Sequence, residues 1–385
     1  PDPAAQRGAG HTHGQVCFRK TLIRSKTAGR SERQLSSVCI SCMEVGAALK
    51  IHYPFENRPP PYAYDALGPY IHEKRMHLRF VEKQIKIVLY PAHMGNLVHS
   101  SKEGCNMRMS GQKGFEGWYF KHQKGDDMVA FIPGRAVSGD FIQLISREGA
   151  RQFQVSDLTV CNGMIQADRC WFSSQGCHIE LPGISGEIVY GPLTPLCSDI
   201  MGPFRFFPME CRHGVLSMAH TLQGSVRMDG YVHSFEGGLG YVEKDSGTSF
   251  PRSYLWMQCN DFPSACSIMI SIAHIPFCGS SFRGCICAIV YQGREYRLAT
   301  YKGVKVQAFT PEHICLSQGS LLLELDITSP HTGHPLRAPQ CGKMSSTIRE
   351  SCNVHLQARL WERGKAIFSL QSDHAAYEFV PNHGT

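Results

Sequence analysis

The sequence Ser225-Val-Arg-Met-Asp-Gly-Tyr-Val-His-Ser-Phe235 carries the clearest local fold signal in the chain. Asp229-Gly230 separates two short runs in which polar and apolar residues alternate, Ser225–Met228 and Tyr231–Phe235. An Asp-Gly pair favours the two-residue turn of a β-hairpin, because both central residues of that turn take positive φ. The stretch therefore predicts two antiparallel strands joined by a tight turn.

Similar runs continue on both sides of this hairpin. From about Gly111 onward, short alternating or apolar runs recur roughly every 8–12 residues between Gly, Pro, Asp and Ser. Long stretches with helical periodicity are absent, so the pattern indicates antiparallel β structure. We expect an all-β protein, and one with a ligand-sized interior would be a barrel or a sandwich.

Composition and charge narrow the class of protein. The 385 residues are 42% hydrophobic and 18% charged, which is typical of a globular protein and excludes a wholly disordered chain. No apolar run approaches the roughly 20 residues of a membrane helix. Residues 1–110 hold 16 basic and 8 acidic residues, whereas the remainder holds 23 and 24. The part of the chain after residue 110 is nearly neutral, so it has no electrostatic reason to bind nucleic acid.

The N-terminal segment differs from the rest. We expect residues 1–105 to be a basic leader, poorly ordered or not part of the native protein. Within it, Phe18–Ser37 is rich in Lys, Arg and Ser, which resembles the composition of an organelle transit peptide. Many of the 17 cysteines lie in apolar, strand-like runs. They predict buried thiols in a reducing compartment, and hence a cytoplasmic protein.

Several stretches place polar and aromatic residues where strand packing does not require them. They are Phe115–Lys121 (FEGWYFK), Met209–Gly214 (MECRHG), Gly240–Pro251 (GYVEKDSGTSFP) and Tyr254–Phe262 (YLWMQCNDF). FEGWYFK, EKDSGTSFP and WMQCNDF, in this order, resemble the tocopherol cyclase family, including its bacterial tocopherol cyclase-like members, which are distant relatives of the carotenoid hydratases. The resemblance runs from about Phe115 to Val306 and more thinly to Phe379.

The resemblance implies two tandem lipocalin-like antiparallel β-barrels, which we place at residues 106–240 and 241–385. It also implies acid-catalysed cyclisation of a prenylated quinol or related isoprenoid. An acid protonates the alkene, and a phenolic oxygen captures the tertiary cation, without a metal or an organic cofactor. The expected partner is an apolar or amphiphilic small molecule, reached either in solution or through peripheral membrane contact.

One position departs from the family pattern. Ser246 stands where the family usually has Trp after the acidic triplet. If that indole lines the pocket, its loss favours a second hypothesis, a non-catalytic lipocalin-like carrier of an amphiphilic or isoprenoid ligand. A third hypothesis is a structural protein, for which both barrels would be filled with bulky side chains.

Residues suited to proton transfer gather in the third motif. Asp245 and Glu243 lie two residues apart and so share one face of an extended strand, together with Tyr241. A buried carboxyl group keeps its proton near neutral pH and can act as an acid. Glu116 is a further candidate acid, and His213 is a candidate base for the quinol hydroxyl. The alternative for Glu243 and Asp245 is a solvated turn with local salt bridges.

Aromatic and amide side chains complete the predicted site. Trp118 and Tyr119 lie on opposite strand faces, so only one of them can face a ligand; Trp118 suits a barrel core. Trp256 could stabilise a cation, and Gln258 or Asn260 could hold a quinol hydroxyl. No metal site is expected, because the spacings around His213 match no compact ligand set.

Overall fold

The computed structural model describes residues 114–277, 280–328 and 332–382, together with the backbone of four strands nearer the N-terminus. The chain divides into two compact units, Pro1–His93 and Met94–Thr385. The expectation for residues 1–105 falls mostly outside the described residues. Within the first unit two antiparallel hairpins are described, formed by β1 (Leu35–Cys42) with β2 (Ala47–Pro54) and by β3 (Met76–Val81) with β4 (Gln84–Leu89).

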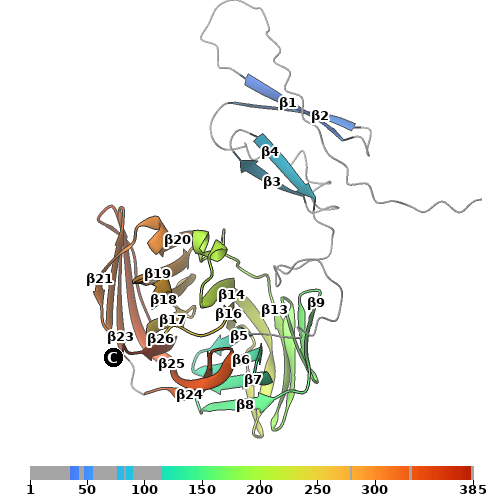
Figure 1. Cartoon of the computed structure of the whole chain (residues 1–385), viewed down its shortest axis with the longest axis vertical. Helices are drawn as coiled ribbons and strands as arrows, with labels where there is room; N and C mark the ends of the chain where they lie inside the picture. Colours follow the sequence, from blue (N-terminus) through green and yellow to red (C-terminus); the bar gives the residue numbers. More distant parts are fainter. Residues whose placement is uncertain are drawn as a thin grey trace, which may run out of the picture. The chain divides into compact units, whose positions relative to one another are not determined.

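The second unit contains a first antiparallel sheet of twelve strands (Figure 1). Its strands are β5 (Phe115–Lys124), β6 (Asp127–Ala136), β7 (Gly139–Ser146), β8 (Ala150–Gln154), β9 (Leu158–Cys161), β10 (Met164–Ala167), β11 (Cys170–Ser173), β12 (Gly176–Leu181), β13 (Ile184–Tyr190), β14 (Cys211–Met228), β15 (Tyr231–Ser234) and β16 (Leu239–Gly247). Their order is β8-β7-β6-β5-β16-β14-β13-β12-β11-β10-β9, and β15 pairs with β14. The short 3-10 helix η1 (Gly202–Phe206) lies in the connection between β13 and β14.

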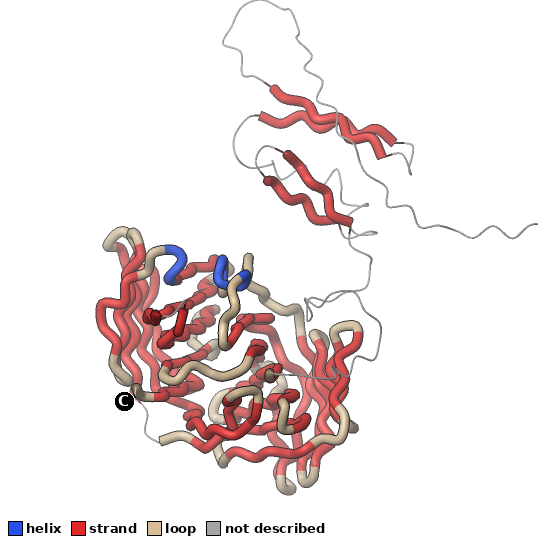
Figure 2. Tube along the Cα trace, viewed as in Figure 1, coloured by secondary structure: helices blue, strands red, loops and turns tan. Residues whose placement is uncertain are grey.

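A second antiparallel sheet of ten strands follows. Its strands are β17 (Tyr254–Cys259), β18 (Cys266–Phe277), β19 (Ser280–Tyr291), β20 (Arg294–Ala299), β21 (Lys305–Phe309), β22 (His313–Gln318), β23 (Leu321–Thr328), β24 (His334–Gln340), β25 (Lys343–Glu362) and β26 (Lys365–Val380). Their order is β20-β19-β18-β17-β26-β25-β23-β22-β21, and β24 pairs with β25. Strands and loops make up nearly all of the described chain (Figure 2).

Both sheets curl until their edge strands approach each other. The edges of the first sheet, β8 and β9, are consecutive in the chain and separated only by residues 155–157, a link that spans at most about 14 Å. The edges of the second sheet, β20 and β21, are likewise joined only through the 3-10 turn η2 (Thr300–Lys302) and two further residues. The expectation of two tandem lipocalin-like barrels is therefore confirmed.

The hairpin predicted at residues 225–235 is present. Met228 pairs with Tyr231 across the turn, and Asp229 and Gly230 have φ of 50° and 93°. These positive values are those of the two-residue turn that an Asp-Gly sequence favours.

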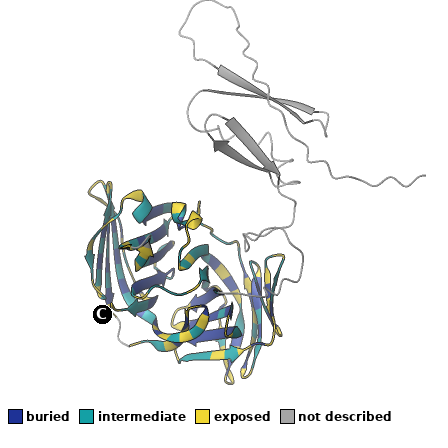
Figure 3. Ribbon diagram, in the orientation of Figure 1, coloured by how far each residue is buried: buried dark blue, intermediate teal, exposed yellow. Residues whose placement is uncertain are grey.

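Each barrel encloses its own apolar core, and buried residues form bands along the strands of both (Figure 3). In the first barrel Phe120, Phe131 and Phe172 are fully buried, and the rings of Phe120 and Phe172 stack at 5.1 Å. In the second barrel Leu, Ile and Cys side chains fill the interior. The expectation of a ligand-sized barrel interior is not met where these cores lie, because the side chains pack across it.

A third apolar cluster joins the two barrels. It combines Tyr119, Met218 and Tyr241 from the first barrel with Trp256 and Met269 from the second. The structural boundary lies between β16 and β17. The division expected between residues 240 and 241 instead cuts through β16, because the motif that suggested a new domain is the last strand of the first sheet.

The expectations about buried cysteines and about membrane helices can both be compared with the described residues. Six of the described cysteines are buried, as the apolar runs around them predicted. No described helix is both long and apolar enough to cross a membrane.

Candidate active site

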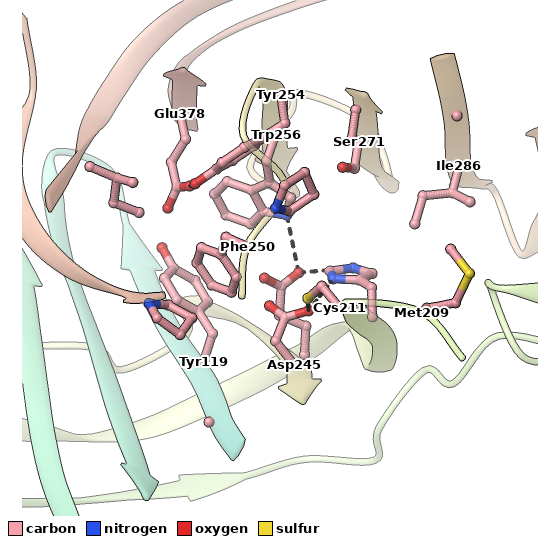
Figure 4. A pocket seen from close by; sticks show the side chains of 18 of the residues that line it. Tyr119, Met209, Cys211, Asp245, Phe250, Tyr254, Trp256, Ser271, Ile286 and Glu378 are labelled. Atoms are coloured by element: carbon pink, nitrogen blue, oxygen red, sulfur yellow. Dashed lines mark hydrogen bonds and ion pairs between the residues drawn. The ribbon is translucent and has the colours of Figure 1, made fainter. Parts of the chain in front are cut away.

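A cavity lies between the two barrels (Figure 4). Its volume is about 170 Å³. Strands β5, β14 and β16 form one wall, and β17, β18, β19, β25 and β26 form the other. The polar and aromatic lining residues include Tyr119, Cys211, His213, Glu243, Asp245, Phe250, Tyr254, Trp256, Arg337, Glu350 and Glu378.

Strand alternation places the acidic motif on this cavity. Val242 belongs to the core of the first barrel, so its neighbours Tyr241 and Glu243 project from the opposite face. Antiparallel pairing sets His213 of β14 against Asp245 and Tyr119 of β5 against Glu243. The prediction that residues 241, 243 and 245 share a face is confirmed. That face lies between the barrels rather than inside one of them.

Glu243 is the centre of a hydrogen-bonded group. Its Oε2 accepts a hydrogen bond from the Tyr241 hydroxyl at 2.6 Å and another from Trp256 Nε1 at 3.2 Å. His213 Nε2 lies 3.4 Å from the same oxygen, and His213 Nδ1 lies 2.9 Å from Asp245 Oδ1. All of these contacts to Glu243 fall on Oε2, which leaves Oε1 for a proton or a ligand.

Burial and charge determine the protonation of this group. Burial raises the pKa of Glu243 to about 7, with the His213 cation opposing this shift and Asp245 adding to it. Burial by itself lowers the pKa of His213, but the carboxylates of Glu243 and Asp245 outweigh it and raise that pKa to about 9. The raised pKa favours the protonated imidazole of His213 near neutral pH, so its role as a base for the quinol hydroxyl stays a prediction.

A second pair of carboxyl groups lies on the opposite wall. Glu350 and Glu378 are cross-strand partners on β25 and β26. Tyr119 donates a 2.5 Å hydrogen bond to Glu350 Oε1, and Tyr254 donates a 2.6 Å bond to Glu378 Oε2. Burial raises the pKa of Glu378 to about 8. Burial and the charge of Glu378 hold the pKa of Glu350 well above its usual range.

Aromatic rings surround the space between the two acidic groups. Tyr119 and Trp256 meet edge to face with centroids 5.5 Å apart. Phe250 makes similar edge contacts with Phe115 at 5.4 Å and Tyr254 at 6.1 Å. Further along, the lining becomes apolar, with Met201, Phe204, Met209, Ile275, Phe282 and Ile286. The cavity therefore joins a polar, aromatic region to an apolar one.

Five of the ten predicted site residues line the cavity: Tyr119, His213, Glu243, Asp245 and Trp256. Tyr241 lies directly behind Glu243, fully buried and bonded to it. The alternative of a solvated turn is wrong, because Glu243 is only 5% exposed.

The other four lie elsewhere. Glu116 forms ion pairs with Lys244 at 2.6 Å and Arg135 at 3.5 Å, and it is not a lining residue. Trp118 is in the core of the first barrel, as its strand face suggested, and so does not contact a ligand in the cavity. Gln258 accepts a bond from Lys121 at 3.0 Å, and Asn260 donates to the Gly240 carbonyl at 2.9 Å. Both amides therefore have structural partners.

Ser246 also lies off the cavity. It is one residue beyond Asp245 on β16, and so projects from the opposite strand face. It pairs with Glu116 and Arg212 on the neighbouring strands and is not a lining residue. The serine at this position therefore leaves the cavity wall unchanged.

His213, Glu243 and Asp245 could also hold a metal ion, because one ligand atom from each lies within 4.8 Å of the others. Each imidazole nitrogen already faces a carboxylate, and the raised pKa of His213 keeps the ring protonated. A metal ion needs the neutral imidazole and would have to displace that proton. The donor set fits a proton-transfer group better than a metal centre.

About half of the chain matches a known protein family. Residues 190–380 match the family described as tocopherol cyclase-like. The chain is 28% identical over 205 residues to a probable chloroplastic tocopherol cyclase of Oryza sativa subsp. japonica, covering 49% of this chain and 44% of that protein. It is 27% identical over 188 residues to the chloroplastic tocopherol cyclase of Zea mays, covering 45% and 40%. The matched part thus spans less than half the length of these relatives.

Among solved structures, the chain is similar to CghA bound to Sch210972, with a TM-score of 0.47 and 9% identity over 71% of this chain and 90% of that one. Kievitone hydratase from Nectria haematococca gives a TM-score of 0.40 and 13% identity over 70% and 88%.

Proposed function

We propose that the chain is an acid catalyst of the tocopherol cyclase-like kind, which closes an oxygen ring on a prenylated quinol or related isoprenoid phenol; the match of residues 190–380 to that family supports this. The observation that supports this most directly is the position of Glu243. Its carboxyl group is buried beside aromatic rings and has a pKa near 7, and one of its oxygens accepts two hydrogen bonds and lies 3.4 Å from His213 Nε2.

In the first step Glu243 gives its proton to the alkene of the prenyl tail. The π electrons form the new C–H bond and leave a tertiary cation on the neighbouring carbon. The faces of Trp256 and Tyr119 can stabilise that cation through their ring quadrupoles. Tyr241, Trp256 and the His213 cation stabilise the carboxylate that Glu243 becomes.

In the second step a lone pair of the phenolic oxygen forms the C–O bond. The O–H bond breaks, and its proton passes to the Glu243 carboxylate, which restores the starting acid. Asp245 holds the His213 cation in place through the 2.9 Å contact. The product is an isomer of the substrate, so this reaction requires no oxidant or reductant.

Glu243 suits the donor role better than Glu350. An acid is strengthened when its conjugate base is stabilised. Two hydrogen bonds and the nearby His213 cation would stabilise a negative charge on Glu243. A charge on Glu350 has one hydroxyl partner and the Lys121 cation in its favour, but Glu378 opposes it more strongly. The apolar region around Met209, Phe204 and Ile286 suits the remainder of the isoprenoid tail.

The test is to incubate the full chain with prenylated quinols and to search for a product of unchanged mass that has lost one hydroxyl and one alkene. Glu243→Gln keeps the size of the side chain but removes the transferable proton, so it should bind substrate and lose at least about a hundredfold in turnover. Asp373→Asn is the matched control, since Asp373 is an exposed acidic residue of β26 paired with His355.

The carrier hypothesis makes the opposite prediction. A carrier would bind the quinol saturably and return it unchanged, and binding would be the same in wild type and Glu243→Gln. Equal turnover in the two proteins would remove Glu243 from the mechanism. The position of Ser246 away from the cavity removes the observation that favoured a carrier.

A further inference from the structure

Glu350 and Glu378 are the strongest unexplained polar feature of the cavity. They face each other across β25 and β26, on the wall opposite Glu243, and both line the cavity. The proposed proton transfer uses neither of them. The buried Lys121 cation lowers the pKa of Glu350, but burial and the charge of Glu378 outweigh it. The pair therefore needs a further explanation, because burying a carboxylate is costly unless it is fully paired.

The hydrogen bonds of the pair are incomplete. Each carboxyl group accepts from one tyrosine, Tyr119 or Tyr254. Glu350 is fully buried, yet its Oε2 has no hydrogen-bond partner among the described residues. An unpaired buried oxygen of this kind costs about 1–3 kcal/mol and is usually satisfied by a ligand, a water or a shared proton.

Glu350 and Glu378 are neighbouring carboxyl groups in a buried wall that excludes water, so they cannot both stay negatively charged. At least one of the two carboxyl groups therefore keeps its proton near neutral pH, in agreement with the raised pKa of both. Such a pair can donate one hydrogen bond and accept another. A ligand hydroxyl group can match both properties, because it accepts one hydrogen bond and donates another.

The pair is also held at a defined place relative to Glu243. Tyr119 of the first barrel bonds Glu350 of the second, and Trp256 of the second barrel bonds Glu243 of the first. The two aromatic rings touch each other. A flat ligand beside these rings would therefore have an acidic group at each end.

We propose that Glu350 and Glu378 form a second binding site in the cavity, which recognises an uncharged ring hydroxyl of the ligand at the end away from Glu243. This rests on the proposed function for the ligand class, a prenylated quinol. One quinol oxygen closes the ring near Glu243, and the second oxygen is bound by the carboxyl pair. The pair makes no covalent bond; it positions the ring and distinguishes a quinol from a phenol that lacks the second hydroxyl.

The test measures binding to the full chain of two ligands that cannot react: a quinol with a saturated isoprenoid tail, and the matching phenol without the second hydroxyl. Wild type should prefer the quinol by about tenfold, the value of one good hydrogen bond in a buried site. Glu378→Leu should reduce this preference to less than about twofold. Glu378→Gln, which can still donate and accept, should retain most of it.

Glu362→Leu is the matched control, because Glu362 is on the same strand as Glu350 but pairs with Arg294 on the surface. It should keep the tenfold preference. If Glu378→Leu does not fold, Glu378→Gln and the infrared carbonyl band of a protonated carboxyl group in wild type still test the proposal. A missing band in wild type, or a preference lost in Glu378→Gln, would overturn it.

This proposal and the ring-closure proposal fail in different ways. A quinol preference that survives in Glu378→Leu would refute the second site, whether or not cyclised product forms. A preference that is lost in Glu378→Leu, in a protein that makes no cyclised product, would refute ring closure and leave the second site standing.

Discussion

Tyr241→Phe should weaken the proposed acid without changing its position. The substitution removes one oxygen atom from a fully buried side chain. It removes the 2.6 Å hydrogen bond to Glu243 Oε2 but leaves the contacts from Trp256 and His213 in place. The Tyr241 bond favours the charged form of Glu243, so its loss should raise the pKa of Glu243 above its value of about 7.

The size of the effect follows from the type of bond. A hydrogen bond to a charged group contributes about 1.5–3 kcal/mol, and one pKa unit corresponds to about 1.4 kcal/mol. The pKa of Glu243 should therefore rise by about one to two units. Because the donor must be protonated, turnover falls as pH rises through this pKa, and that fall should move upward by the same amount. The plateau at low pH should drop by at most about ten- to a hundredfold, since the acid is weaker.

The assay is the pH dependence of turnover at saturating prenylated quinol, followed by the product of unchanged mass. Tyr377→Phe is the control, because Tyr377 is also buried but donates to the Pro311 carbonyl away from Glu243. It should keep both the plateau and the position of the fall. If the fall in Tyr241→Phe stays where it is in wild type, or moves to lower pH, Glu243 is not the group whose protonation limits turnover.

Two further predictions concern stability. Burial raises the pKa of Glu378 from its ordinary value of 4.5 to about 8, so between these pH values the native state keeps a proton that the unfolded chain releases. The unfolding free energy of wild type, relative to Glu378→Gln, should therefore fall across this range by up to about 1.4 kcal/mol per pH unit. Urea denaturation that gives the same difference between the two proteins at pH 5 and pH 8 would contradict this. Gly186→Ala should destabilise the first barrel by about 1–3 kcal/mol, because a Cβ there would lie 2.3 Å from the Ser225 carbonyl oxygen and 2.7 Å from Val226 Cα, both backbone atoms of β14. Gly117→Ala, where the nearest atoms are 4.0 Å away, should stay within about 0.5 kcal/mol of wild type in the same urea titration.

The local features of the fold could be predicted because they depend on neighbouring residues. Alternation along Gly240–Ser246 correctly placed Tyr241, Glu243 and Asp245 on one face, since successive side chains of a strand point to opposite sides. The same rule separated Trp118, which lies in a barrel core, from Tyr119, which lies on the cavity. It could not say whether that shared face looks into a barrel or out of it, because the core on the other side is assembled from distant strands.

Glu350 and Glu378 were missed for a related reason. Each is a single acidic residue in a strand, outside the motifs that carry the family resemblance. Glu378 stands between Tyr377 and Phe379, and an isolated charge between two aromatic residues is a weak sign of an unusual environment. Their meeting depends on the β25–β26 register, which shifts at bulges close to Glu350. Such register shifts cannot be derived from alternation.

The position of the cavity explains why neither barrel could form this site alone. The first barrel provides Glu243, Asp245 and His213, and the second provides Trp256, Glu350 and Glu378. The hydrogen bonds from Tyr119 to Glu350 and from Trp256 to Glu243 each cross the interface, so an aromatic residue of one barrel orients an acid of the other. Both barrel cores are closely packed, and this rigidity lets the outer faces hold the acids in fixed positions. A substitution that shifts one barrel against the other would therefore disturb both acidic groups together, even if each barrel kept its own fold.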